Sequence, residues 1–322
     1  MKTRKIACAL IGLSALVALP ALADSYPSKP VKIVVGAAPG GPNDMVARML
    51  GEQLSRSTGG SFVVENRGGG GGVIAATHVA RSDPDGYTLL MGAVSTHGIT
   101  PSLYKNLEYD PIKDFTPISQ VVTYPLVMVV NAGVPAQNLS EFIDYAKQNG
   151  SKVMRASSGN GSSMHLAGDM FNSAAGTELY HVPYKGSAPA VLALLANDVH
   201  VNFESIPLAF PHVQSGKLRA LGVTGKSRIS IMPDTPTISE SLPGYEISGW
   251  FGLLAPKGTP QSIIDRLHAE VVKALEEPEL KKSFDAQIME TVGSSPEEFR
   301  IFIDGELSKF AKVVKESGAT VE

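Results

Sequence analysis

Cysteine is almost absent from this chain of 322 residues. The one cysteine, Cys8, lies in the first 23 residues, so the rest of the chain has no thiol for a disulfide or for nucleophilic catalysis. Clusters of lysine and arginine are also lacking after residue 23. A phosphate-binding surface needs such a basic patch, and its absence argues against nucleic acid as a partner.

The common motifs of hydrolases are lacking as well. The chain has no G-x-S-x-G nucleophile elbow and no H-E-x-x-H zinc motif. Its seven histidines are scattered, without the close pairing of metal ligands. Residues 70–75 and 220–227 resemble nucleotide-binding loops, but each lacks a residue that such a loop requires. We therefore expect no enzymatic activity, no cofactor and no metal.

Long apolar runs are limited to the N-terminus. Three basic residues precede an apolar stretch at residues 6–19. Residues 21–23 have small residues at both positions that a signal peptidase recognises. A spanning helix needs about 18 apolar residues, so residues 1–23 are predicted to be a secretory signal peptide, cleaved before Asp24. The mature chain would be periplasmic. Loss of three basic residues would change its formal charge from −3 to about −6.

Short apolar, β-branched runs alternate with stretches of helical spacing along the mature chain. This rhythm predicts parallel or mixed α/β sheets, and the length suits two domains that pack closely around a cleft. Residues 73–81, 139–148 and 162–175 are predicted helices, and residues 260–316 are mostly helical. The predicted strands are residues 31–35, 61–65, 87–91, 126–130, 152–156, 179–182, 199–203, 218–223 and 250–254.

A glycine-containing loop at residues 38–44 follows the first strand and precedes a helix. The first N–H groups of a helix are unpaired and carry about half a positive charge, so such a loop can bind an anion without a basic side chain. The alternative is an ordinary turn, in which Asn43 or Asp44 caps the helix and Asp44 pairs with Arg48. The candidate ligand-binding residues here are Pro39, Gly40, Gly41, Asn43 and Asp44.

The second unit has an analogous loop at residues 157–165, whose hydroxyl groups add hydrogen-bond donors. A plain polar loop with a serine cap is its alternative. A third loop, at residues 92–98, suits the same cleft wall, although His97 reads better as a structural histidine than as a base. Since ligands of open α/β sheets bind at the carboxyl ends of strands, these loops would meet in one cleft. The candidates are Ser157, Ser158, Gly161, Ser162, Ser163 and His165, with Ser95 and Thr96 from the third loop.

Ordered segments across the mature chain resemble the Bug-type extracytoplasmic solute receptors of tripartite tricarboxylate transporters. The matching segments lie at residues 26–48, 65–72, 84–90, 103–115, 157–166, 181–186, 218–221 and 243–253.

The resemblance implies a type II periplasmic-binding-protein fold, in which two α/β lobes close on a ligand. Domain 1 would comprise residues 24–124 plus 250–322, and domain 2 would be inserted as residues 125–249. The crossovers would lie near residues 124–126 and 249–250. Such receptors hold carboxylates by loop backbone, hydroxyl groups and water rather than by an arginine.

The expected function is therefore capture of a small carboxylate, either a di- or tricarboxylate, an acidic amino acid or an aromatic carboxylate. The partners would be the permease subunits of a tripartite tricarboxylate-type transporter, and we expect a monomer. The alternative is a ligand-binding sensor, which would bind the same carboxylate and signal to a membrane receptor instead of a permease. Departures from the family pattern at residues 94–97, Thr100, Arg155 and Asp169 leave the ligand open, and alternation does not decide whether Arg155 points into the cleft.

Overall fold

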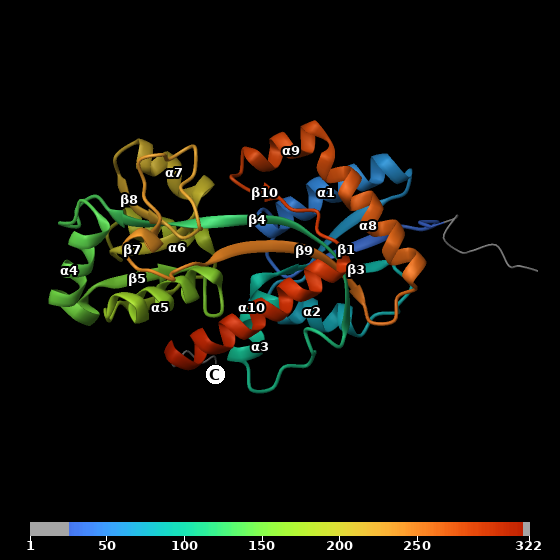
Figure 1. The fold of residues 1–322 in the computed structure, drawn as a ribbon, viewed down its shortest axis with the longest axis horizontal. Coiled ribbons are helices and arrows are strands. Elements are labelled where there is room, and N and C mark those ends of the chain that lie inside the picture. The colour runs from blue at the N-terminus through green and yellow to red at the C-terminus, as the bar shows by residue number, and fades with distance from the viewer. Residues whose placement is uncertain (1–25, 318–322) are drawn as a thin grey trace, which may run out of the picture.

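The computed structural model describes residues 26–317, so the predicted signal peptide and its cleavage site lie outside the described residues. Within this part of the chain, two α/β lobes are joined by two long strands that run side by side, β4 and β9 (Figure 1).

Both ends of the described chain build the first lobe. In its sheet, β1 lies between β2 and β3 and is parallel to both, and β3 pairs in turn with antiparallel β9. The elements are β1 (Val31–Val35), α1 (Pro42–Thr58), β2 (Phe62–Asn66), α2 (Val73–Ala80), β3 (Thr88–Ala93), α8 (Gln261–Glu276), α9 (Pro278–Asp285), β10 (Glu290–Thr291) and α10 (Pro296–Ser317).

The second lobe is built from the middle of the chain. Here β5 is parallel to β6 and β7, and β4 runs antiparallel to β7 and β8. The elements are α4 (Leu139–Asn149), β5 (Met154–Ser157), α5 (Ser163–Ala175), β6 (Tyr180–Pro183), α6 (Ser187–Leu195), β7 (Val201–Ser205), α7 (Ile206–Gln214) and β8 (Leu218–Val223).

The strand β4 (Phe115–Asn131) changes partners between the lobes. It pairs with β9 (Ser248–Pro256) as far as Pro125, which lies opposite Ser248, and from Leu126 onward it pairs with β7. The change falls where the resemblance implied a crossover. The residue limits of the two domains stay a prediction.

One cluster of buried apolar side chains includes residues of both lobes, among them Phe171 of α5 and Phe310 of α10. The buried members of two further clusters come from one lobe each. A groove of about 930 Å³ lies at the crossovers and is lined by residues of both lobes, including Tyr124, Lys226 and Lys281. The lobes therefore share part of their core through α10, which packs against α5 (Figure 1).

Two segments outside the predicted helices and strands are structured. Gly70–Gly72 forms a short 3₁₀ turn, and residues 69–72 all have positive φ, a conformation that favours glycine. The prediction of a loop at residues 92–98 is wrong, because β3 extends to Ala93 and Ser95–Ile99 forms a π-helical turn. This turn runs into the short helix α3 (Thr100–Leu103). Gly98 permits it, since a Cβ there would lie 3.0 Å from Phe310 Cδ2 of α10.

Candidate ligand-binding site

The first loop turns sharply into α1. Gly40 has a φ of +82°, and Gly41 is the N-cap residue without a side-chain cap, so neither Asn43 nor Asp44 caps the helix. Pro42 begins the helix, where its missing N–H costs nothing. Pro39 and Gly40 are exposed, while Asn43 is buried with its Nδ2 donating to Met91 O (3.3 Å).

The side chain of Asp44 stabilises this loop through hydrogen bonds. Its carboxylate accepts hydrogen bonds from Gly40 N (2.9 Å), Arg48 Nε (3.0 Å) and Asn66 Nδ2 (2.8 Å). Burial raises the pKa of Asp44, but these hydrogen bonds outweigh it and the pKa is lowered. The predicted pairing of Asp44 with Arg48 is confirmed. Its side chain therefore shapes the loop.

The second loop is held by its own side chains. Ser162 caps α5 by accepting from His165 N (3.2 Å), as the sequence suggested. Ser157 is fully buried and its Oγ lies 2.6 Å from His181 Nε2. Gly161 is buried with a φ of +76°. Ser158 and Ser163, by contrast, are partly exposed.

The third segment is buried in lobe 1. Thr96 Oγ1 accepts from Ala93 N (3.1 Å) and lies 2.9 Å from His97 Nδ1. The ring of His97 packs edge-on against Phe115, and complete burial lowers the pKa of His97 to about 3. His97 is thus a neutral core residue. Ser95 is partly exposed, whereas Thr96 is buried.

These segments meet through small residues. A Cβ at Gly36, before the first loop, would lie 2.7 Å from Gly72 Cα, and one at Gly72 would lie 2.6 Å from Thr96 Cγ2. Across the lobes, a Cβ at Gly161 would lie 3.4 Å from Leu103 Cδ1 and 4.0 Å from Thr100 Cγ2. The chain therefore brings the β1–α1 loop, the glycine turn, the third segment and the β5–α5 loop together between the lobes. The sequence did not predict Gly72 or Leu103 at this place, although the run of glycines is a local feature there. It singled out Thr100 only as a departure from the family pattern.

Arg155, which precedes the second loop, makes its contacts with residues of α5. Arg155 is 2% exposed, and its guanidinium pairs with Asp169 and donates to His165 O (3.0 Å). It therefore points beneath α5, which answers the question left open by the sequence. The starts of α1 and α5 bring to these loops the positive partial charge of helix N-termini, whose first N–H groups have no partner within the helix.

Glu204 is a further buried group that the sequence did not reveal. It stands at the end of β7, opposite Val127 of β4 and next to the crossover. Its carboxyl group accepts from Ser205 N (2.7 Å), Ser205 Oγ (3.0 Å) and Asn202 Nδ2 (3.1 Å). Complete burial raises the pKa of Glu204 to about 7 despite these bonds.

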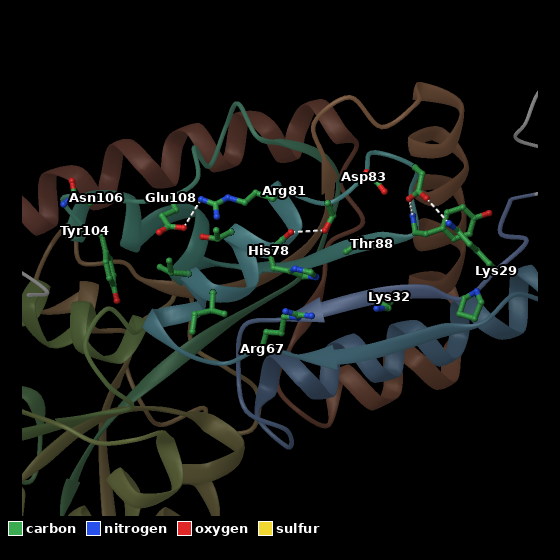
Figure 2. Close-up of a pocket in the computed structure, with 17 residues that line it drawn as sticks. Lys29, Lys32, Arg67, His78, Arg81, Asp83, Thr88, Tyr104, Asn106 and Glu108 are labelled. Carbon is green, nitrogen blue, oxygen red and sulfur yellow. Dashed lines mark hydrogen bonds and ion pairs between the residues drawn. The ribbon is translucent and has the colours of Figure 1, made fainter.

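A larger groove, of about 1020 Å³, lies on lobe 1 and is lined in part by Arg67 and Val73, which flank the glycine turn (Figure 2). Its rim carries the ion pairs Lys29–Asp85 and Arg81–Glu108, and none of the predicted ligand-binding residues lines it. Among residues 26–317, no cluster of three or more histidines, cysteines and acidic residues is suited to a metal ion. None of the helices in that range has the length and apolar character needed to cross a bilayer.

Known proteins resemble this chain over nearly its whole length. Residues 46–319 match the tripartite tricarboxylate transporter family receptor model. Protein BugT of Bordetella pertussis is 37% identical over 319 residues, which cover 98% of each chain.

Solved structures are also similar to this chain over most of its length. R. palustris Rpa4515 with adipate has a TM-score of 0.86 and 34% identity, and the match covers 92% of this chain and 100% of that one. MatC of Rhodopseudomonas palustris with bound malate has a TM-score of 0.82 and 32% identity over 90% of this chain and 100% of that one. The predicted two-lobed α/β fold of periplasmic solute-binding proteins is confirmed by these neighbours. The chain belongs to the tripartite tricarboxylate transporter receptor family.

Proposed function

We propose that this protein captures a small carboxylate between its two lobes and delivers it to the permease subunits of a tripartite tricarboxylate-type transporter. The observation that carries the proposal is the meeting of Gly161 from lobe 2 with Thr100 and Leu103 from lobe 1. It places the loop that opens α5 against the segments that adjoin the loop before α1. The ligand would be a di- or tricarboxylate, an acidic amino acid or an aromatic carboxylate.

The ligand would be held by groups that remain accessible in the two loops. These are the backbone around Pro39, Gly40 and Gly41, and the partly exposed Ser95, Ser158, Ser162 and Ser163. The first N–H groups of α1, at the buried Asn43, follow the first of these loops. The side chains of Asp44, Thr96, Ser157 and His165 make hydrogen bonds within their own lobe. We assign these four the task of shaping the site, with Gly161 as its closest point between the lobes.

The structures of relatives support a carboxylate. Rpa4515 was solved with adipate and MatC with malate, and both have the fold of this chain. The family is one of transport receptors, so we expect bound ligand to be released unchanged. Export to the periplasm after cleavage before Asp24, a monomeric state, and lobes formed by residues 24–124 plus 250–322 and by residues 125–249 belong to the same proposal.

Thermal melting of ligand-free mature protein against adipate, malate, other di- and tricarboxylates, acidic amino acids, aromatic carboxylates and neutral nicotinamide tests the proposal. A ligand at 100 times its dissociation constant adds about 2.7 kcal/mol, which raises Tm by several degrees in a chain of this size. A selective shift with one carboxylate would support it. A flat response to every carboxylate from folded, ligand-free protein would contradict it.

The predicted alternative, a sensor, uses the same site and differs only in its partner. Cross-linking in cells, followed by identification of the captured membrane protein, separates a permease from a signalling receptor.

A further inference from the structure

Two histidines stack directly behind the β5–α5 loop. The rings of His165 in the first turn of α5 and of His181 in β6 have centroids 4.1 Å apart and are inclined by 13°. His165 is 6% exposed and His181 is partly exposed. Each ring makes one hydrogen bond that bears on the loop.

His165 fixes the position of Gly161. Its Nδ1 accepts from Gly161 N (3.2 Å), so this ring nitrogen carries no proton. The proton of the neutral ring is therefore on Nε2, which lies 3.2 Å from Asp169 Oδ2. Gly161, at a φ of +76°, is the residue that approaches Leu103 across the lobes.

His181 acts on the other end of the loop. Its Nε2 lies 2.6 Å from Ser157 Oγ, and that oxygen accepts from Gly159 N (3.1 Å). A hydroxyl that donates to His181 keeps its lone pairs for the Gly159 amide. The amides of Gly159 and Gly161 are thus oriented by a serine and a histidine within lobe 2.

Burial and the charge of Arg155 keep both rings neutral. Arg155 of β5 pairs with Asp169 of α5 and donates to His165 O (3.0 Å), and the hydroxyl of Tyr245 donates to Ala167 O (2.9 Å) on the same helix. Burial and then the charge of Arg155 lower the pKa of His165 to about 4. Burial, His165 and Arg155 lower the pKa of His181 to about 2.

We propose that His165 and His181 are positioning residues, which hold the β5–α5 loop ready for a ligand, and that His165 does so only while its ring is uncharged. This inference rests on the proposed function in one respect, that the loop forms a wall of the ligand site. A protonated His165 has no acceptor for Gly161 N–H, so the loop would lose its brace at the point where the lobes meet.

Two ligand-free measurements test the geometry. Proton–nitrogen NMR of the histidine rings at neutral pH should show neutral rings with the proton of His165 on Nε2. Amide exchange at Gly161 should accelerate at least tenfold in H165L and much less in H165N, because the asparagine Oδ1 replaces the Nδ1 acceptor. An imidazolium or an Nδ1–H tautomer at His165, or unchanged exchange at Gly161 in H165L, overturns the proposal.

Affinity for adipate and malate, measured in wild type and variants, tests the role of the loop in ligand binding. We expect H165L to weaken binding of whichever probe the wild type takes by about tenfold, the scale of one lost buried hydrogen bond, and H165N to recover most of it. The matched control is H200L, since His200 Nδ1 accepts from Met154 N (3.0 Å) at the opposite end of β5. H200L should keep the affinity within about twofold while losing a similar hydrogen bond.

An equal loss of affinity in H165L and H200L would mean that the ring of His165 contributes to stability alone. That result would overturn its positioning role. If the wild type binds no carboxylate, the proposed function fails, whereas the NMR and exchange results still decide whether the rings brace the loop.

Discussion

The indole N–H of Trp250 donates a hydrogen bond to the carboxylate of Glu306 across 3.1 Å. Trp250 lies fully buried on the crossover strand β9, and Glu306 belongs to α10, the helix that packs against both lobes. The indole also meets Phe299 and Phe302 edge-on, at 5.5 Å each. This contact therefore ties a strand that joins the lobes to the helix that spans them.

Trp250 is the single tryptophan of the chain, so its fluorescence should report lobe movement. Hinges of such proteins lie where strands pass between lobes, and Trp250 lines the groove at the crossovers. We expect tryptophan emission to change with the same carboxylate, and over the same concentrations, that raise Tm. W250F should lose the signal while the melting shift remains. A carboxylate that raises Tm without any change in emission would contradict movement at this strand.

The glycine turn should tolerate no side chain at Gly72. A methyl group there would lie 2.6 Å from Thr96 Cγ2, at a φ of +96°. Gly216 has a comparable φ of +71° with no atom within 4 Å of its Cβ position, so G216A measures the backbone cost alone. We expect G216A to cost about 1–2 kcal/mol and G72A about 1–3 kcal/mol more from overpacking.

Urea unfolding of both variants measures these costs. Equal destabilisation would show that the segment at Thr96 yields to the methyl group, which would contradict close packing between the glycine turn and the third segment.

Local patterns predicted the strands that are short and apolar, and they missed those that rely on distant partners. β8 was predicted residue for residue as Leu218–Val223. β4 was expected only at residues 126–130, because polar residues such as Ser119 and Gln120 interrupt its first half. There, Ser119 Oγ donates to Ser294 O (2.9 Å) and Gln120 N donates to Ser294 Oγ (3.1 Å). Pairings 174 and 175 residues apart leave no local signal.

The candidate site shows the same limit. The serine cap at Ser162 follows from a local rule and could be predicted. The inward turn of Arg155 depends on packing, since a Cβ at Gly168 of α5 would lie 2.5 Å from Arg155 Nη1. Alternation along β5 gives the face of a residue but not the groups that a helix brings to that face.

Removal of Arg155 should be costly, because Asp169 would remain as a buried, unpaired carboxylate. The side chains of the pair are only 3% and 11% exposed. Breaking such a pair typically costs about 3–5 kcal/mol, whereas replacing both partners by apolar residues is often nearly neutral. We expect R155M to lose several kcal/mol in urea unfolding and R155M/D169L to recover much of it.

The exposed pair of Arg228 with Glu240 provides the comparison, with side chains 47% and 45% exposed. R228M should cost less than about 1 kcal/mol, because solvent screens such pairs. A double variant no more stable than R155M would show that the contacts of Arg155 with His165, rather than its charge pairing, dominate.

Glu204 should make stability fall as pH rises toward neutrality. Its pKa in the folded protein is raised to about 7 from 4.5, so the folded state binds the proton more tightly than the unfolded chain does. The resulting stabilisation is complete below pH 4.5, declines between pH 4.5 and 7, and is absent above that range. E204Q mimics the neutral acid at every pH and should flatten this decline.

The free energy of unfolding measured in urea at pH 5 and pH 8 checks this, with D198N as a control because Asp198 is exposed at the far end of β7. Relative to wild type, E204Q should gain stability between the two pH values, by at most roughly 3 kcal/mol. If the difference in unfolding free energy between E204Q and wild type is the same at pH 5 and pH 8, Glu204 is ionised at both. The hydrogen bonds from Ser205 and Asn202 would then compensate for its burial beside the crossover.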